Sequence, residues 1–498
     1  MTTEGQNQTA LRIGYPGHWV SLVPALQHNA YADLILGHQF ETLIETGGDG
    51  KVYPQAARSW EIDPDMKVFT FRIDTDRCFS DGTPLEAGHF KESWEYGLSL
   101  RPKSAKSSLQ DVLYKVEGFE DFAETGSLQG LVVLDRETFQ IRFRTPFRMG
   151  LENLMGTRLA VFKRQGTEYI GTGKFIIREL DENALQLLKN RHAQSTTSFD
   201  EIYISYHRPE VIKKELEIGN INVIQRAGKG IVSVREISEA VEISSLGAFE
   251  TAHMVLSVNG AGDHLFSNPG LRQAFQYLIY KGLSGEETSA DIFSNFSLRV
   301  DPQIYLPARA GHLDETTVRD LIGRGKSHVA DLVAATRKNP VKFVHRWGFD
   351  GLASLIKKIL KENGVGFEIT EAQSMKEFAD YYYKNTVPDL VLASLNVAGG
   401  DPDGIYHALG RDGAISSPKH LRDTVQDLLE AGRSIVDQRL IHEHYQKVSW
   451  AVLEEVPFVH LGFSIEFIAY RNDQLQPKHE ESYARERAVA VNYLEPRL

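Results

Sequence analysis

The amino-acid sequence predicts an α/β protein with two or three packing units, and three observations lead to this fold class. Between residue 250 and about residue 395, strands alternate with helices of about ten residues, which is typical of a mainly parallel sheet with helices on both faces. The chain has 498 residues, more than one ordinary hydrophobic core accommodates. It contains no internal repeat and no low-complexity linker, so we expect the units to share crossing strands.

The N-terminal half begins with a strand–loop–helix unit and continues with antiparallel strands. Residues 11–15 have the pattern of a short strand, and they are followed by a loop and by an apolar helical stretch over residues 22–43. Residues 67–73 alternate apolar and polar side chains and predict a β-hairpin with residues 60–62. A helix with an apolar face is expected over residues 87–98.

Two local features of this half have a structural interpretation. In the stretch Ser80–Pro84 we expect a turn, in which Asp81 bonds the backbone two residues further on and Gly82 adopts a positive φ. Trp60 and Phe71 lie on the two strands of the hairpin, and we expect them to pair on a buried face as core residues.

The C-terminal half carries the alternation of strands and helices. Arg272 begins an apolar helix over residues 271–279, and because a cation there opposes the helix dipole, we expect it to form a structural ion pair. The expected strands are residues 254–259, 341–344, 365–369 and 389–393, and the further expected helices are residues 352–361 and 376–384.

Charge and cysteine content exclude several classes of protein. Lys plus Arg number 55 and Asp plus Glu number 67, a net charge of −12 without a basic patch, so no nucleic-acid partner is expected. The single cysteine, Cys78, provides neither an intramolecular disulfide nor a structural zinc site, and suits both the cytoplasm and an exported protein. Residues 1–9 lack the apolar segment of an export signal, and no apolar run is long enough to span a bilayer.

Two glycine-rich strings imitate nucleotide-binding loops. Gly323–Ser327 contains Gly-Lys-Ser, but Asp320 stands where a phosphate-binding loop needs its first glycine. Gly171-Thr172-Gly173 lacks the third glycine of a dinucleotide fingerprint, because position 176 is isoleucine, and we interpret it as a turn.

Two other strings imitate metal sites. His442 and His444 are two residues apart, so on a helix their rings point about 200° apart and do not face one ion. Asp401-Pro402-Asp403-Gly404 resembles the start of a calcium loop, but Ile405 occupies the next ligand position. Since no nucleophile elbow, metalloprotease helix or kinase motif is present, the sequence predicts no catalytic residue, no metal and no cofactor.

Other blocks match a known family in order. The most specific block joins Pro54–Glu61 to Phe69–Arg72 and Phe79–Leu85. The other blocks are Gly171–Phe175, Leu187–Asn190, Glu217–Val223, Val258-Asn259 with Asn268–Ala274, and Arg439–Pro457. From about residue 10 to 475 the chain thereby resembles the family 5 extracellular solute-binding proteins of bacterial ABC importers, which include oligopeptide-, dipeptide- and nickel-binding receptors.

The resemblance implies a type II periplasmic-binding-protein fold with two discontinuous lobes and an additional third domain. Lobe one would combine residues 10–40, 160–248 and 470–498, the additional domain would be residues 41–159, and lobe two would be residues 249–469. A small organic ligand, peptide-like or oligosaccharide-like, would be enclosed between the lobes by hinge closure.

The resemblance also implies a receptor rather than an enzyme. It would be a monomer, periplasmic or extracellular and membrane-tethered, that delivers its ligand to the permease of an ABC transporter. Two alternatives stay open at this point. One is the ligand-sensing domain of a regulator, for which residues 1–9 are too short to supply a DNA-binding segment. The other is a cleft enzyme, for which the sequence offers no convergent acid–base or nucleophilic groups.

Candidate ligand contacts follow the carboxyl ends of three expected strands, because open α/β sheets bind ligands there. The strands concerned are residues 11–15, 341–344 and 389–393. Tryptophan side chains at these ends could stack on a ligand, and an asparagine could orient its polar atoms. The candidate ligand-binding residues are Tyr15, His18, Trp19, Arg346, Trp347, Asn396, Val397, Ala398 and Gly399.

The segment from Leu395 to Asp403 departs from the peptide-binding members of the family that the chain resembles. Aligned on Asp401-Pro402-Asp403, whose aspartates are expected to cap the next helix, it has Leu395 in place of a tryptophan. Ala398 replaces the aspartate that binds a peptide's N-terminal ammonium. A charge-assisted bond contributes roughly 1.5–3 kcal/mol, so we expect free-amine peptides to bind at least about tenfold more weakly. A sugar, a blocked or cyclic peptide, or another uncharged ligand would suit this segment.

Overall fold

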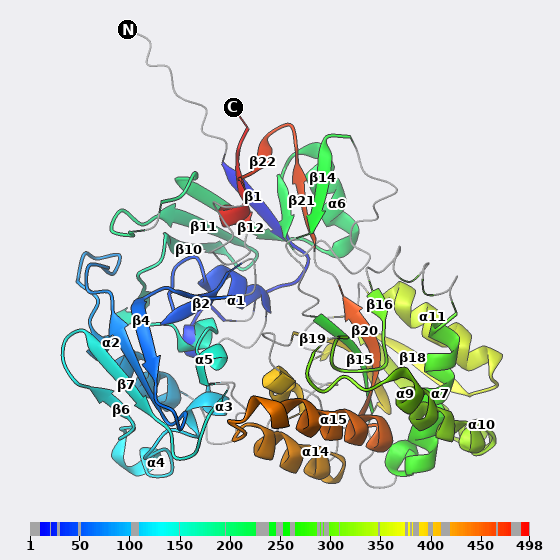
Figure 1. The fold of residues 1–498 in the computed structure, drawn as a ribbon. Coiled ribbons are helices and arrows are strands. Elements are labelled where there is room, and N and C mark those ends of the chain that lie inside the picture. The colour runs from blue at the N-terminus through cyan, green and yellow to red at the C-terminus, as the bar shows by residue number, and fades with distance from the viewer. Residues whose placement is uncertain are drawn as a thin grey trace. The chain divides into compact units, whose positions relative to one another are not determined.

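The computed structural model divides the chain into two units, and the chain passes between them more than once (Figure 1). Unit 1 comprises residues 1–227, 235–248 and 467–498, and unit 2 comprises residues 228–234 and 249–466. The bounds expected for the lobes and the additional domain stay a prediction. The structure describes residues 10–19, 21–26, 30–47, 51–100, 109–148, 150–194, 196–225, 239–245, 252–258, 264–285, 289, 292, 298–307, 309–346, 349–373, 377–378, 381, 388–396, 402–409, 419–464, 467–479 and 490–497.

The largest sheet of unit 1 has seven strands among the described residues, in the order β10-β11-β12-β1-β13-β21-β14. β1 runs parallel to β12 and β13, and the other neighbours are antiparallel. α6 (Pro209–Ile218) connects β12 to β13, and α1 (Ala30–Leu36) contributes to the same core. The strands are β1 (Leu11–Tyr15), β10 (Phe175–Asp181), β11 (Ala184–Lys189), β12 (Glu201–Tyr206), β13 (Val223–Gln225), β14 (Val241–Ser245) and β21 (Phe467–Arg471).

The prediction of one helical stretch over residues 22–43 is wrong. The structure has two short helices, η1 (Pro24–Leu26) and α1, and then β2 (Ile44–Thr46), which pairs with β3 (Val52–Pro54). The helix does not continue to residue 43, because the carbonyl groups that it would need there are used elsewhere. Those of His38 and Gln39 accept hydrogen bonds from the backbone of residues 175 and 173.

A second sheet of unit 1 is antiparallel, in the order β4-β5-β7-β6, and α2 (Ala87–Ser99) packs on its core. Trp60 lies opposite Phe71 in this sheet, and both side chains contact the same core, so their expected core role is confirmed. The strands are β4 (Ala57–Ile62), β5 (Val68–Ile73), β6 (Leu131–Val133) and β7 (Thr138–Arg142). Smaller elements are α3 (Gln110–Leu113), α4 (Phe122–Thr125), α5 (Gly150–Asn153), η2 (Thr157–Leu159), β8 (Lys163–Gln165), β9 (Glu168–Ile170), β22 (Leu475–Pro477), α17 (Ala490–Tyr493) and β23 (Leu494–Pro496).

The turn at Asp81 also has the expected geometry. The backbone N–H of Thr83 donates to Asp81 Oδ1 at 3.0 Å, and Gly82 has a φ of 82°. Lys163 on β8 donates to the other carboxylate oxygen at 2.7 Å. The local sequence was therefore sufficient to predict this turn.

Unit 2 contains a six-stranded sheet among its described residues, in the order β16-β20-β15-β19-β17-β18. β17, β18 and β19 are parallel, as expected. The sheet as a whole is mixed rather than mainly parallel, because the strands that open and close the unit, β15 and β20, lie antiparallel with Ala252 opposite Ser464. The strands are β15 (Ala252–Val258), β16 (Leu298–Val300), β17 (Val341–Arg346), β18 (Phe367–Ala372), β19 (Leu390–Asn396) and β20 (Phe458–Ser464).

Helices cover both faces of this sheet, as the sequence predicts (Figure 1). Phe343 of β17 packs with helices on one face, and its neighbour Val344 packs with helices on the other. The first face is covered by α7 (Pro269–Leu283), α10 (Val329–Lys338) and α11 (Asp350–Glu362), and the second by α14 (Lys419–Gly432) and α15 (Gln438–Glu455). Shorter elements are η3 (Leu265–Ser267), α9 (Glu315–Gly323), η4 (Arg324–His328), η5 (Pro402–Ile405) and α13 (Tyr406–Leu409).

Candidate ligand-binding site

In unit 1, three parallel strands end at one edge of the large sheet. β1 and β12 end level with one another, because Tyr15 lies opposite Tyr206, and β13 continues beside them to Gln225. The carboxyl ends of parallel strands are where open α/β sheets hold ligands. This edge therefore carries the unit 1 part of the candidate site.

The rings of Tyr15 and Trp19 lie in the core beneath this edge. Tyr15 is fully buried, its ring meets that of Tyr31 edge-on at 5.6 Å, and its hydroxyl donates to Gln225 Oε1 at 3.4 Å. Trp19 is 7% exposed and belongs to the same core. Both rings thus stabilise the edge, and their contact with a ligand stays a prediction.

His18 links the loop after β1 to two neighbouring elements. Its Nε2 lies 2.7 Å from the carbonyl oxygen of Glu182, in the turn between β10 and β11. Its ring stacks on Trp19 at 4.8 Å and meets Tyr206 edge-on at 5.2 Å. The loop is therefore held in place by the strand ends around it.

Tyr206 and His207 lie at this edge as well, although they were not among the expected site residues. The backbone N–H of His207 donates to the carbonyl of Tyr15 at 3.0 Å, and its Nε2 lies 2.7 Å from Ser205 Oγ. Burial lowers the pKa of His207, and the nearby charge of Glu215 opposes this shift. The alternation of Ile202 and Ile204 with polar positions is the signal that could have identified this strand.

In unit 2, Arg346 and Asn396 lie at the same edge of the six-stranded sheet. Arg346 ends β17 and Asn396 ends β19, and these adjacent strands run parallel, with Val344 opposite Val391. The guanidinium carbon of Arg346 lies 4.4 Å from the centre of the Phe349 ring. Trp347, Val397, Ala398 and Gly399 lie outside the described residues.

A buried ion pair follows this edge in the chain. Asp403 in η5 is 1% exposed, and its Oδ2 lies 3.0 Å from Nε of the fully buried Arg433. Tyr445 of α15 donates to the other carboxylate oxygen at 3.2 Å. Asp401, the partner of Asp403 in the expected helix cap, lies outside the described residues. Sequence reasoning missed Arg433 because 30 residues separate it from Asp403.

Within the part of the chain that the structure describes, no group of three or more His, Cys, Asp and Glu side chains could hold a metal ion. No helix in the same part is both long and apolar enough to cross a membrane.

Comparisons with known proteins give local sequence matches and full-length structural matches. A model of the bacterial extracellular solute-binding proteins, family 5 Middle, matches residues 51–281. The periplasmic oligopeptide-binding protein OppA of Escherichia coli (strain K12) is 31% identical over 111 residues, 22% of this chain and 20% of that protein. Alignments with the curated relatives span only 10% to 26% of those proteins' lengths.

Several solved structures match nearly the whole chain, including those of two binding proteins with bound ligands. Haemophilus influenzae OppA in complex with RPPGFSPFR has a TM-score of 0.79 at 13% identity, with 99% of each chain covered. The binding protein AgaA from A. tumefaciens R10, in complex with agropinic acid, has a TM-score of 0.76 at 17% identity, with 98% of this chain and 99% of that chain covered. These likenesses confirm the expected fold class. The family model assigns residues 51–281 to the bacterial extracellular solute-binding proteins, family 5, the family that the ordered sequence blocks resemble.

Proposed function

We propose that this protein is the substrate-binding receptor of an ABC importer. It captures a small organic solute, peptide-like or oligosaccharide-like, by closure of its lobes and delivers the solute to the membrane permease. The observation that carries the proposal is the match of the solute-binding family model to residues 51–281, combined with a fold shared over nearly the whole chain with binding proteins. We further propose that it acts as a monomer in the periplasm or tethered outside the cell, and that it is not an enzyme.

A ligand screen followed by scattering tests the function. Purified protein is heated with peptides, sugars and opines, because a ligand that binds only the folded state stabilises it, by about 2.7 kcal/mol at one hundred times its Kd. We expect at least one compound to raise the midpoint temperature of thermal unfolding. The same compound should lower the radius of gyration of the protein in small-angle scattering. Binding without compaction would contradict closure, and chemical conversion of a bound compound would indicate an enzyme.

Substitutions at the two sheet edges test the site once a solute is identified. His18→Ala, Trp347→Ala and Asn396→Ala are measured by calorimetry, and Trp19 is left intact because its ring belongs to the core. Trp450→Ala is the matched control, since this tryptophan is 43% exposed on α15. We expect a loss of about tenfold or more from at least one site variant. Changes below twofold in all three would show that the site lies elsewhere.

The residue at position 398 is proposed to determine ligand class. An aspartate there would supply a carboxylate for a peptide's ammonium group, and it would leave an unpaired buried charge against an uncharged solute. Ala398→Asp should therefore improve the affinity for free-amine di- to pentapeptides and weaken that for the natural solute. Calorimetric titration of both proteins decides this, and tight binding of such peptides by the unchanged protein would contradict it.

A further inference from the structure

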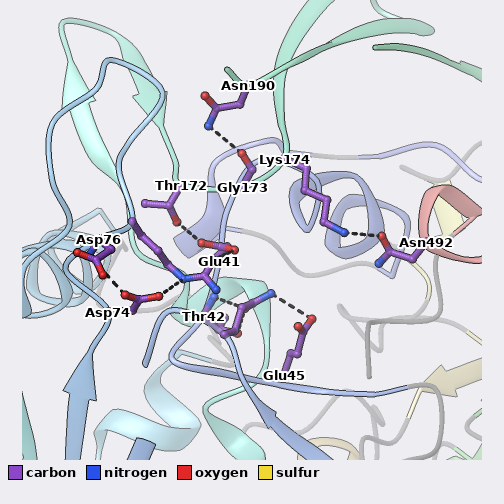
Figure 2. Close-up of polar contacts among 12 residues, drawn as sticks. Glu41, Thr42, Glu45, Asp74, Asp76, Thr172, Gly173, Lys174, Asn190 and Asn492 are labelled. Carbon is purple, nitrogen blue, oxygen red and sulfur yellow. Dashed lines mark hydrogen bonds and ion pairs between the residues drawn. The ribbon is translucent and has the colours of Figure 1, made fainter. Parts of the chain in front are cut away.

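Three segments of unit 1 that are distant in sequence meet at the buried carboxylate of Glu41. Thr172 donates its hydroxyl to Glu41 Oε2 at 2.7 Å, as Figure 2 shows, and Arg77 donates from Nη1 to Oε1 at 2.6 Å. The side chain of Glu41 is only 8% exposed, and Arg77 Nε lies 3.3 Å from Asp74 Oδ2. Because a charge so far from water is costly unless paired, Glu41 depends on these partners.

The glycines on either side of Thr172 allow this contact. A Cβ atom on Gly171 would lie 2.1 Å from the carbonyl oxygen of Gln39, and one on Gly173 would lie 2.7 Å from the carbonyl oxygen of His38. The backbone N–H of Gly173 donates to Gln39 at 2.9 Å. The Gly-Thr-Gly string lies in a bend between β9 and β10. Its glycines permit close backbone approach, and its threonine supplies the hydrogen-bond donor.

These contacts lie where the chain is expected to leave lobe one and to return to it. Glu41 begins the expected additional domain, and its carbonyl accepts a hydrogen bond from the N–H of Val161, just after that domain ends, at 2.8 Å. Ser80, inside the domain, donates its N–H to the carbonyl of Gly171 at 3.0 Å. The two ends of residues 41–159, where this stretch joins the rest of unit 1, therefore lie at one cluster of contacts.

We propose that Glu41, Arg77 and Thr172 form a joint that locks residues 41–159 to the rest of unit 1. The two parts then move as one body, and the closure proposed above takes place without a hinge near residues 40 and 160. The assignment of both parts to a single unit by their contacts supports the joint independently. The buried ion pair between Glu41 and Arg77 stabilises the joint, and the close backbone contacts at Gly171 and Gly173 bring its segments together.

Hydrogen exchange of the full ligand-free chain tests the joint. Glu41→Gln keeps the shape of the side chain and removes its charge, so Arg77 keeps Asp74 but loses the charge of Glu41. We expect the amides of Val161, Gly173 and Phe175 to exchange at least about tenfold faster, because their opening no longer breaks the buried pair. Strands β5 and β12, in the two sheets that the joint connects, should keep their exchange rates.

Four further variants complete the test. Glu137→Gln is the matched control, since it breaks an Arg–Glu pair with Arg58 in which both side chains are more than 40% exposed, and it should leave the joint amides unchanged. Thr172→Val removes only the hydroxyl donor and should speed their exchange about threefold. Gly173→Ala should push the segment around residue 173 away from His38 and Gln39. Gly88→Ala should leave these contacts unchanged, because no atom of another segment lies within 4 Å of its added Cβ.

Either of two results would overturn the proposal. In one, the joint amides keep their exchange rates in both Glu41→Gln and Thr172→Val. In the other, exchange accelerates equally in β5, β12 and the joint, which would show that the cluster contributes only to global stability. If Glu41→Gln does not fold, the exchange rates of Thr172→Val at the joint and in β5 and β12 decide alone. The test does not require that the solute be identified.

Discussion

Arg433 and Asp403 form an ion pair that is removed from solvent, with 0% and 1% of their side chains exposed. The guanidinium carbon of Arg433 lies 3.7 Å from the centre of the Tyr406 ring. Each charge in such a place requires the other, since desolvation of a single ion outweighs any packing that it gains.

Breaking this pair from one side should therefore cost more than removing both charges. We expect Arg433→Met to lower the free energy of unfolding by about 3–5 kcal/mol, because the carboxylate of Asp403 is left buried and uncompensated. The double variant Asp403→Leu, Arg433→Met should recover most of this loss. Urea denaturation followed by circular dichroism measures both, and a double variant as unstable as the single one would contradict the argument.

His460 is a second residue whose charge state is determined by burial. Its Nδ1 lies 2.7 Å from the carbonyl oxygen of Asp301, so this nitrogen carries the hydrogen. Burial lowers the pKa of His460 to about 4, against the opposing effect of that backbone hydrogen bond. The folded protein therefore holds this ring neutral at pH values where the unfolded chain protonates it.

The stability of the protein should depend on pH through this ring. Its usual pKa, 6.5, lies above the folded value, so the unfolded state binds more protons between pH 6.5 and 4, and stability falls as pH falls through that window. Between pH 7.5 and 5 we expect the unchanged protein to lose about 2 kcal/mol more than His460→Asn. Urea titrations at both pH values measure this, and equal losses would show that His460 is protonated in the folded state.

At the scale of elements, Arg272 of α7 joins this helix to two others. Its Nη1 donates to the carbonyl groups of Phe266 and Ser267 in η3, and its Nε donates to that of Glu455, the last residue of α15. Its Nη2 also lies 3.7 Å from Glu455 Oε2. The ion pair expected from the sequence is thereby confirmed, and the carbonyl contacts add a role that the sequence did not indicate.

Replacing Arg272 should loosen this junction of helices. Arg272→Met keeps much of the side-chain volume but leaves three carbonyl groups without their donor, so we expect a loss of about 3 kcal/mol in the free energy of unfolding. Arg319→Met on the exposed surface of α9 is the control and should change it by less than about 0.5 kcal/mol. A loss no larger than that of the control would show that solvent satisfies the carbonyl groups.

At the scale of the whole molecule, the chain leaves unit 1 and returns to it on adjacent strands. β14 and β21 are antiparallel, with Ser245 opposite Phe467. The larger segment of unit 2, residues 249–466, is therefore an insertion whose two connections meet at one strand pair of unit 1.

Unit 1 should consequently fold without unit 2. If residues 246–466 are replaced by Asn-Gly, which favours a two-residue type I′ turn, β14 and β21 become an ordinary hairpin. We expect cooperative thermal unfolding and a circular dichroism spectrum of mixed α/β type. Pro-Pro in place of Asn-Gly does not fit this turn and serves as the control. Loss of cooperativity with Asn-Gly would mean that unit 1 depends on unit 2.

Short-range patterns were enough to predict several parts of this protein. Alternation of apolar and polar residues placed Trp60 opposite Phe71, and turn chemistry predicted the bond from Thr83 to Asp81. The parallel β17, β18 and β19 followed from the spacing of strands and helices. Ordered sequence blocks predicted the resemblance to the solute-binding family, whose model matches residues 51–281. Each of these depends on neighbours within a few residues, or on a periodicity that one face of an element imposes.

Only the tertiary structure determined which polar groups leave water, and with which partners. The bonds from Thr172 to Glu41 and from Arg433 to Asp403 join residues 131 and 30 positions apart, and no spacing indicates them. The ring of Trp19 packs in the core of unit 1, and its contact with a ligand stays a prediction. Burial depends on everything that packs against a side chain, so it is determined only when the whole chain has folded.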